Sequence, residues 1–394
     1  MTDRPASALT VTASASLISA VLGSIHAFSV LIVPLEDAFG AGRSAVALTY
    51  SLALVALTLA VLFGPAVYGR ASAARFVALV AVVGAGGAFI ASTAPGLITV
   101  WLGYSLVFGA ANGLGYGFGL QIAAQVNPGR EGLAMGIVTA AYALGAMLSP
   151  ALFDGAVASG GFGHAMRWLA LSLAVSGAAS ALLLWRAGAR FQAPPRAERP
   201  EPAELRAQAL LWCGYFASVL AGLMVIGHAA GIAQSFQPDL AAWIAPALIA
   251  ACNLAGSLAG GRLADLVPLR HLLAGLAVMS ASALAVLAAD AGALLLLLGL
   301  GAIGFTYGGT ISAYPAAVVK LFGMARSPQI YGRVFTAWGA AGLLGPWLAG
   351  MLFDLSGAYR PALFAAALLS LSATVAVFLL FPKKAVGRPG EGPS

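Results

Sequence analysis

The feature that most constrains this chain is a succession of apolar runs, each about twenty residues long, separated by short polar segments. An α-helix of about this length crosses the roughly 30 Å hydrocarbon core of a bilayer. Only 8% of the residues are charged, against about 25% in soluble domains, which is too few to cover a surface exposed to water. In lipid, the 49 glycines favour close packing of helices. The sequence therefore predicts an all-α membrane protein.

The apolar runs predict twelve transmembrane helices near residues 10–33, 44–68, 75–94, 98–122, 133–157, 165–186, 208–233, 240–264, 270–289, 291–320, 333–354 and 359–381. The long segment in the middle, RAGARFQAPPRAERPEPAELRAQ, is rich in Pro, Arg and Glu and is typical of a domain linker. The expected organisation is an N-terminal six-helix bundle, a cytoplasmic linker, a C-terminal six-helix bundle and a cytoplasmic tail, at residues 1–186, 187–207, 208–381 and 382–394.

The basic residues predict the orientation in the membrane. Of the 20 lysines and arginines, all but Arg43, Arg167 and Arg360 fall in the two termini, the linker or the loops on the same side as these. Because cytoplasmic loops are enriched in Lys and Arg, both termini and the linker are expected in the cytoplasm, with a bacterial inner membrane as the expected location. The same distribution explains the net charge of +7 without nucleic acid, since the cations form no basic patch.

The two predicted bundles resemble each other at corresponding places. GIVTAAYALGAMLSPALFD in the fifth helix matches GRVFTAWGAAGLLGPWLAGMLFD in the eleventh, which pairs Pro150 with Pro346 and Asp154 with Asp354. The first and seventh helices each carry one histidine, His26 and His228. The sequence therefore predicts two pseudo-symmetric halves of the same orientation, a repeat known among secondary transporters, with a binding site near mid-membrane at their interface.

Several function classes are disfavoured by what the sequence contains. Cys213 and Cys252 lie in apolar runs without metal-binding spacing, so neither a disulfide framework nor a metal site is expected. The glycine-rich GLGYGFG lies inside a predicted span and follows no strand, so it is no dinucleotide fingerprint, and no P-loop is present. We expect no enzyme, no cofactor and no ATP-driven pump. The expected partners are a small-molecule substrate, protons and the lipid bilayer, for a monomeric protein.

Five segments carry a family resemblance: FSVLIVPLEDAFGAGRSAVALTYSL from Phe28, GAANGLGYGFGL from Gly109, REGLAMGIVTAAYALG from Arg130, GGTISAYPAAVVKLFG from Gly308 and YGRVFTAWGAAGLLGPWLAGMLFDLSGAY from Tyr331. They resemble the oxalate/formate antiporter and monocarboxylate transporter branch of the major facilitator superfamily. The resemblance implies the major facilitator fold and alternating-access transport of a small, monocarboxylate-like organic anion, either with protons or by exchange.

This chain departs from that branch where the branch binds its anion. The branch usually has an arginine in the eighth helix that holds a carboxylate; here the stretch Asn253-Leu-Ala-Gly-Ser257 places a serine there. The eleventh helix lacks the lysine of some members. One alternative is therefore a transporter of a neutral or weakly charged metabolite, vitamin or drug-like compound. A nontransporting membrane sensor is a third hypothesis, although the linker and tail are too short to hold a signalling domain.

His26 and His228 are candidate proton-coupling residues because ionisable side chains inside a membrane span are costly and usually functional. If both rings approach one central cavity, protonated histidines could replace the missing arginine. Alternatively, each ring is neutral and hydrogen-bonded within the bundle. Asp265 and Arg262, in a stretch that resembles the superfamily's G-x-L-A-D signature, are candidate gating residues, or simply loop charges.

Polar and aromatic residues within the spans are expected to complete the substrate site, since Tyr and Trp combine an apolar face with a hydrogen-bonding edge. Others of this kind serve only as packing or interfacial anchors. The candidate substrate-binding residues are His26, Tyr50, Asn112, Tyr116, Gln121, Tyr142, His228, Asn253, Ser257, Tyr307, Tyr314 and Trp338.

Overall fold

The structure is a computed structural model that describes residues 8–128, 130–192, 202–289, 292–322 and 327–380. Every regular element in these ranges is a helix. The first half contains α1 (Ala8–Leu22), the 3₁₀ segment η1 (Gly23–Leu31), α2 (Ile32–Phe39), α3 (Arg43–Phe63), α4 (Pro65–Tyr68), α5 (Ala73–Ser92), α6 (Leu97–Val100), the π-helical segment η2 (Trp101–Phe108), α7 (Gly109–Gln125) and α8 (Glu131–Arg186). The second half contains α9 (Pro202–Ile226), α10 (Ala229–Phe236), α11 (Ile244–Leu266), α12 (Leu269–Ala288), α13 (Ala293–Phe322), α14 (Ser327–Ser356) and α15 (Arg360–Leu380).

The number of spans agrees with the sequence-based prediction. Eleven continuous helical stretches in the described residues are long and apolar enough to cross a membrane. One of them, Ala134–Arg186, is interrupted at Gly160 and Gly161, where the backbone leaves helical geometry and Gly161 has a φ of 71°. A positive φ is readily adopted by glycine, so the chain reverses there and α8 forms two arms. Twelve spans result, and the prediction of a multi-pass, all-helical membrane protein is confirmed.

Several helix ends differ from the prediction. The first membrane segment continues through Pro34 to Phe39, beyond the predicted end at residue 33. Pro34 is the third residue of α2, and the N–H that proline lacks has no partner to lose in the first turn of a helix. Helix α9 begins at Pro202, inside the segment assigned to the linker.

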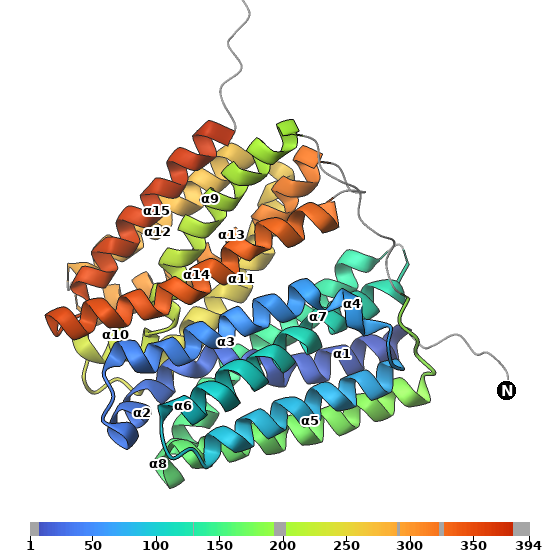
Figure 1. The fold of residues 1–394 in the computed structure, drawn as a ribbon. Coiled ribbons are helices and arrows are strands. Elements are labelled where there is room, and N and C mark those ends of the chain that lie inside the picture. Colours follow the sequence, from blue (N-terminus) through green and yellow to red (C-terminus); the bar gives the residue numbers. More distant parts are fainter. Residues whose placement is uncertain (1–7, 129, 193–201, 290–291, 323–326, 381–394) are drawn as a thin grey trace, which may run out of the picture.

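The two halves meet along two pairs of helices, α3 with α14 and α8 with α11. Figure 1 shows α3 and α14 side by side near the end of the bundle that holds α2 and α10, while the halves diverge towards the end that holds α4. Small residues allow the close approach of α14: a Cβ on Gly350 would lie 2.9 Å from the Cα of Ser44, and one on Gly342 would lie 2.8 Å from the Cβ of Leu54.

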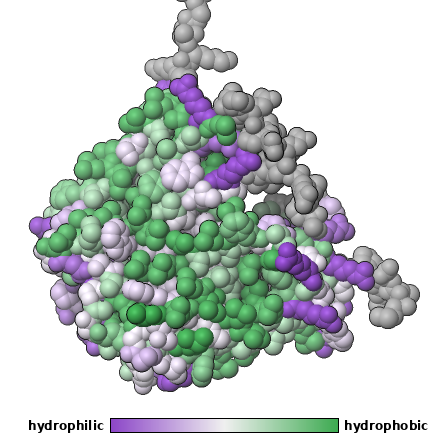
Figure 2. Space-filling view, in the orientation of Figure 1, coloured by the Kyte–Doolittle hydropathy of each residue, from purple (hydrophilic) through white to green (hydrophobic). Residues whose placement is uncertain are grey.

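The outer surface has the apolar character of a surface in contact with lipid. Large apolar side chains are exposed on helices of both halves, including Leu152 at 69% and Leu368 at 69% exposure. Figure 2 shows apolar side chains over most of the visible face, with hydrophilic residues concentrated near its edges. The bilayer, which removes this surface from water, is thus part of the environment in which the fold is stable.

Candidate functional site

A small cavity of about 30 Å³ lies between the two halves. His26 of η1 lines it from the first half, and Asn253 of α11 and Tyr307 of α13 line it from the second. The remaining lining residues are apolar: Ala146, Ile226, Ala229, Pro246, Ile249 and Ala250. Among the described residues, none that lines the cavity carries a fixed charge. His26 is the one lining residue whose side chain can become a cation.

His26 is held by two tyrosines from neighbouring helices. Its Nδ1 lies 2.7 Å from the hydroxyl oxygen of Tyr50 in α3. The ring of Tyr142, in the first arm of α8, meets the imidazole edge-on with ring centroids 5.6 Å apart. Phe28 stacks on the other side of Tyr50 at 5.6 Å. These contacts fix the orientation of His26, and they occupy Nδ1, so Nε2 has no protein partner among the described residues.

The other candidates in the first half form a network behind His26. The Asn112 amide donates to the carbonyl oxygen of Leu22 at 2.6 Å, and its oxygen accepts from the Tyr142 hydroxyl at 3.1 Å. Asn112 is fully buried. Tyr116 lies within hydrogen-bond distance of Thr139, at 3.2 Å, and its ring packs against Tyr142 at 4.6 Å. This network supports the wall of the cavity. Gln121 lies farther along α7 and is half-buried.

In the second half, Tyr307 lines the cavity and is held by Trp338. The Trp338 indole N–H in α14 donates to the Tyr307 hydroxyl at 2.8 Å. Ser257 is directed towards α13, because its hydroxyl donates to the carbonyl oxygen of Gly308 at 3.2 Å. The residue at the expected position of an anion-binding arginine therefore helps α11 pack on α13. Tyr314 is buried within the second half, 4.7 Å from the ring of Tyr215.

The structure separates the two histidines that the sequence paired. His228, between α9 and α10, is fully buried and does not line the cavity between the halves. Its Nε2 lies 2.8 Å from the carbonyl oxygen of Pro346, which can only accept, so Nε2 carries the hydrogen. Its Nδ1 therefore accepts from the Tyr359 hydroxyl at 3.2 Å.

Tyr359 connects His228 to a polar cluster that joins the two halves. The Tyr359 oxygen accepts from Nη1 of Arg43 at 2.8 Å, and Nε of Arg43 donates to Glu36 at 2.7 Å. A second, shorter contact joins Arg43 to the same carboxylate. Asp354 accepts from the backbone N–H groups of Arg43 and Ser44, both at 2.9 Å. We call Glu36, Arg43, Ser44, Asp354 and Tyr359 the interdomain latch.

Sequence reasoning missed this latch although its residues were visible. Asp354 and Tyr359 form part of the D-x-x-G-x-Y succession that carried the family resemblance, and Arg43 is one of three cations on the minority side. Arg43 was interpreted only through membrane topology. An arginine on the side that the positive-inside rule leaves poor in cations was the available signal of a specific partner.

The predicted gating pair lies at the opposite end of the bundle. Arg262 is exposed near the end of α11, and the side chain of Asp265 lies outside the described part of the structure. Lys320 of α13 donates to the carbonyl oxygen of Ala264, so the contact recorded at this loop stays within the second half. The gating role of Arg262 and Asp265 stays a prediction. Among the described residues, no three His, Cys, Asp or Glu side chains are grouped as a metal site requires.

Comparison with known proteins bears on the fold and the family. The model of the Major Facilitator Superfamily matches residues 211–394. The xylose transporter XylE of E. coli, in a partially occluded inward-open conformation, aligns with a TM-score of 0.72 over 95% of this chain and 100% of that chain, at 14% identity. A bacterial homologue of the human lysosomal transporter Spinster, inward-facing and unoccupied, aligns with a TM-score of 0.71 over 95% and 96% of the chains, at 15% identity.

The chain has the major facilitator fold. The family model matches the second half of the chain, and both solved structures share the fold of the whole chain. Two curated relatives are similar over most of their lengths. The MFS-type transporter YhjX of Escherichia coli (strain K12) is 24% identical over 334 residues, 81% of each chain. A 38 kDa protein of the 23S RNA operon of Thermoproteus tenax is 27% identical over 368 residues, 92% of each chain. None of these matches singles out the oxalate/formate or monocarboxylate branch.

Proposed function

We propose that this transporter moves a small organic acid with a single negative charge, together with one proton, by alternating access. The observation that carries the proposal is the position of His26. It is the one side chain lining the cavity between the halves that can become positive, and its Nε2 has no protein partner among the described residues. One protonated imidazole balances one carboxylate, so a monoacid fits this site better than a diacid.

The electrostatics of the cavity explain why substrate and proton would move together. An unpaired carboxylate in an apolar site costs several kcal/mol or more, and this cost falls when an opposite charge lies beside it. With His26 neutral, the cavity offers the anion only uncharged polar groups, those of His26, Asn253 and Tyr307. Binding of the anion therefore favours protonation of His26, and loss of the proton favours release.

The latch supports the alternating-access part of the proposal. It joins the halves at the end that holds α2 and α10, away from α4 (Figure 1), and its contacts break if the halves separate there. The cation distribution favours cytoplasmic termini in a bacterial cell, and with that orientation the joined end corresponds to a state closed towards the outside.

A second candidate, transport of a neutral metabolite, is favoured by Ser257. Its hydroxyl bonds to Gly308 where an arginine would hold a carboxylate. A thermal-stability panel of matched pairs, lactate with lactamide and acetate with acetamide, separates the two candidates at pH 5.5 and 7.5. We expect stabilisation by the acids alone, and more strongly at pH 5.5; stabilisation by the amides alone would favour the neutral substrate.

The role of His26 is tested by uptake into proteoliposomes driven by a pH gradient. We expect His26→Gln to lower proton-driven uptake of the stabilising acid about tenfold or more, equivalent to roughly 1.4 kcal/mol. His271→Gln changes an exposed histidine on α12 and serves as the matched control. Equal uptake and an unchanged pH profile in His26→Gln would refute the coupling role.

A further inference from the structure

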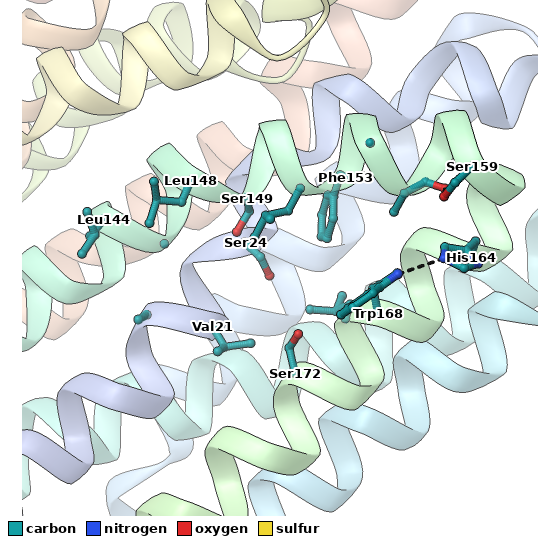
Figure 3. A pocket seen from close by; sticks show the side chains of 16 residues that line it. Val21, Ser24, Leu144, Leu148, Ser149, Phe153, Ser159, His164, Trp168 and Ser172 are labelled. Atoms are coloured by element: carbon teal, nitrogen blue, oxygen red, sulfur yellow. Dashed lines mark hydrogen bonds between the residues drawn. The ribbon is translucent and has the colours of Figure 1, made fainter.

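A much larger hollow of about 550 Å³ lies within the first half, away from the cavity that holds His26. It runs between the two arms of α8 and is lined also by α1 and η1; Figure 3 shows Val21 of α1 and Ser24 of η1 between the labelled residues of the first arm and Ser172 of the second. Its lining is mainly apolar, with several serines and His164 among the polar members. We call it the α8 groove.

The backbone explains why the groove opens where it does. At one end of the groove, which we call the lower end, α1 and the first arm of α8 are in tight contact. A Cβ on Gly145 would lie 1.6 Å from the carbonyl oxygen of Ala20. At the other end, which we call the upper end, the arms are joined by the reversal at Gly160 and Gly161. Between these points the helices diverge, and side chains fill the space only in part.

The α8 groove opens on the surface that faces lipid. Leu148 and Leu152 on the first arm are 51% and 69% exposed, and Trp168 on the second arm is 54% exposed. A shallower hollow of about 340 Å³ continues from it past Leu17 and Val175 and shares Trp168 with it. In a bilayer, hydrocarbon and not water meets such a surface.

The upper end of the groove is polar. The Trp168 indole N–H donates to Nε2 of His164 at 2.8 Å, drawn as the dashed line in Figure 3. Because Nε2 accepts, the neutral ring carries its hydrogen on Nδ1, which can donate to a further group. The exposed Arg167 follows one turn after His164 and is one of the few cations on this side of the protein. Trp and Arg near a span end are typical anchors at the level of lipid headgroups.

We propose that the α8 groove is a binding site for one phospholipid. One acyl chain lies in the apolar groove, and the headgroup phosphate is held at its upper end by His164 and Arg167. A methylene group occupies about the volume of a water molecule, roughly 30 Å³, so a groove of about 550 Å³ accommodates an acyl chain of ordinary length. The polar end lies where a phosphate would follow the chain.

Gly155 allows the groove to be filled without disturbing the fold. It lines the groove, and a Cβ placed on it meets nothing within 4 Å. Gly136 lies on the same arm, is exposed, has equal space and does not line the groove. Gly155→Phe and Gly136→Phe therefore form a matched pair.

The experiment is native mass spectrometry of the full chain, delipidated and titrated with phosphatidylglycerol or with diacylglycerol, which lacks the phosphate. We expect one retained phosphatidylglycerol for the wild type and Gly136→Phe, with at least tenfold weaker retention for Gly155→Phe and for His164→Phe combined with Arg167→Gln. Equal retention by Gly155→Phe, or equal binding of diacylglycerol, would overturn the proposal.

A second measurement does not depend on retention in the gas phase. One equivalent of phosphatidylglycerol with brominated acyl chains should quench the fluorescence of Trp168, and the quenched component should be absent in Trp168→Phe and lost in Gly155→Phe. Quenching that is the same in the wild type and Trp168→Phe would place the lipid elsewhere and overturn the site.

Discussion

The carboxylate of Asp354 in α14 accepts a hydrogen bond of 2.9 Å from the backbone N–H of Arg43, the first residue of α3. The N–H of Ser44 donates to the same carboxylate at 2.9 Å. N–H groups in the first turn of a helix have no intrahelical partner, and Gly42 at the N-cap has no side chain to supply one. One half of the protein therefore caps a helix of the other, and separating the halves at this end uncaps it.

Removal of this cap should shift the conformational equilibrium. We expect Asp354→Ala to favour separation of the halves at the latch by about 1 kcal/mol, roughly fivefold, because the carboxylate is exposed and its hydrogen bonds are weakened by solvent. Distances between spin labels at the exposed positions Asp37 and Asp239, in a chain without Cys213 and Cys252, report the shift.

Asp154 provides the internal control for that variant. It occupies the position in the fifth span that corresponds to Asp354 in the eleventh. Asp154→Ala should leave the label distances as in the wild type. If both variants change them equally, the effect comes from lost charge and not from the helix cap.

A second prediction concerns the hydroxyl of Tyr359. Burial raises the pKa of Tyr359 to about 12, so its hydroxyl remains protonated and can donate to His228 while it accepts from Arg43. Tyr359→Phe keeps the ring against Phe353 but leaves His228 Nδ1 buried without a donor, at a cost of about 1–3 kcal/mol. We expect a lower melting temperature and longer label distances at the latch.

Tyr116→Phe separates these two effects. Tyr116 makes its hydrogen bond to Thr139 within the first half. Its loss should lower the melting temperature without changing the distances at the latch. A Tyr359→Phe protein with wild-type distances would show that the hydroxyl stabilises the second half alone.

A third prediction concerns Tyr50, which orients His26 through Nδ1. In Tyr50→Phe the ring stacked on Phe28 remains, but the imidazole loses its fixed orientation. We expect the KM for uptake to rise about fivefold, equivalent to roughly 1 kcal/mol, with a smaller effect on kcat. Tyr314→Phe, deep in the second half, is the control, and an unchanged KM in Tyr50→Phe would contradict the positioning role.

A fourth prediction tests the tight crossing of α1 and α8. Gly145→Ala places a methyl group where the carbonyl of Ala20 lies, so backbone has to move, at a cost of about 1–3 kcal/mol. We expect a lower melting temperature and reduced yield in the membrane. Gly136→Ala, on the same arm with nothing within 4 Å, should be neutral or slightly stabilising. Equal melting temperatures for the two variants would refute the packing argument.

Properties that depend on neighbours along the chain could be predicted well. Span length, apolar character and the position of breaks are encoded in stretches of about twenty residues, so twelve spans and the fold followed from the sequence. The reversal at Gly160 and Gly161 was placed between two predicted spans. The first span was predicted to end at residue 33, just before Pro34, although a proline in the first turn of a helix does not end that helix.

The site was predictable only in part. His26 was identified because an imidazole inside a span is rare and costly, and the structure places it at the cavity between the halves. His228 had the same sequence signal, yet it is directed to Pro346 and Tyr359. Which way a side chain faces depends on the rotation of its helix against its neighbours, and no local pattern records that rotation.

The sequence by itself determined a membrane-embedded helical scaffold of two halves, because hydrophobic length and repeated motifs are properties of the chain. The tertiary structure alone decided that Arg43 meets Asp354, 311 residues away, and that two arms of α8 diverge over α1. Such contacts arise when the faces of packed helices come together, and the free energy of that packing belongs to pairs of surfaces and not to either segment alone.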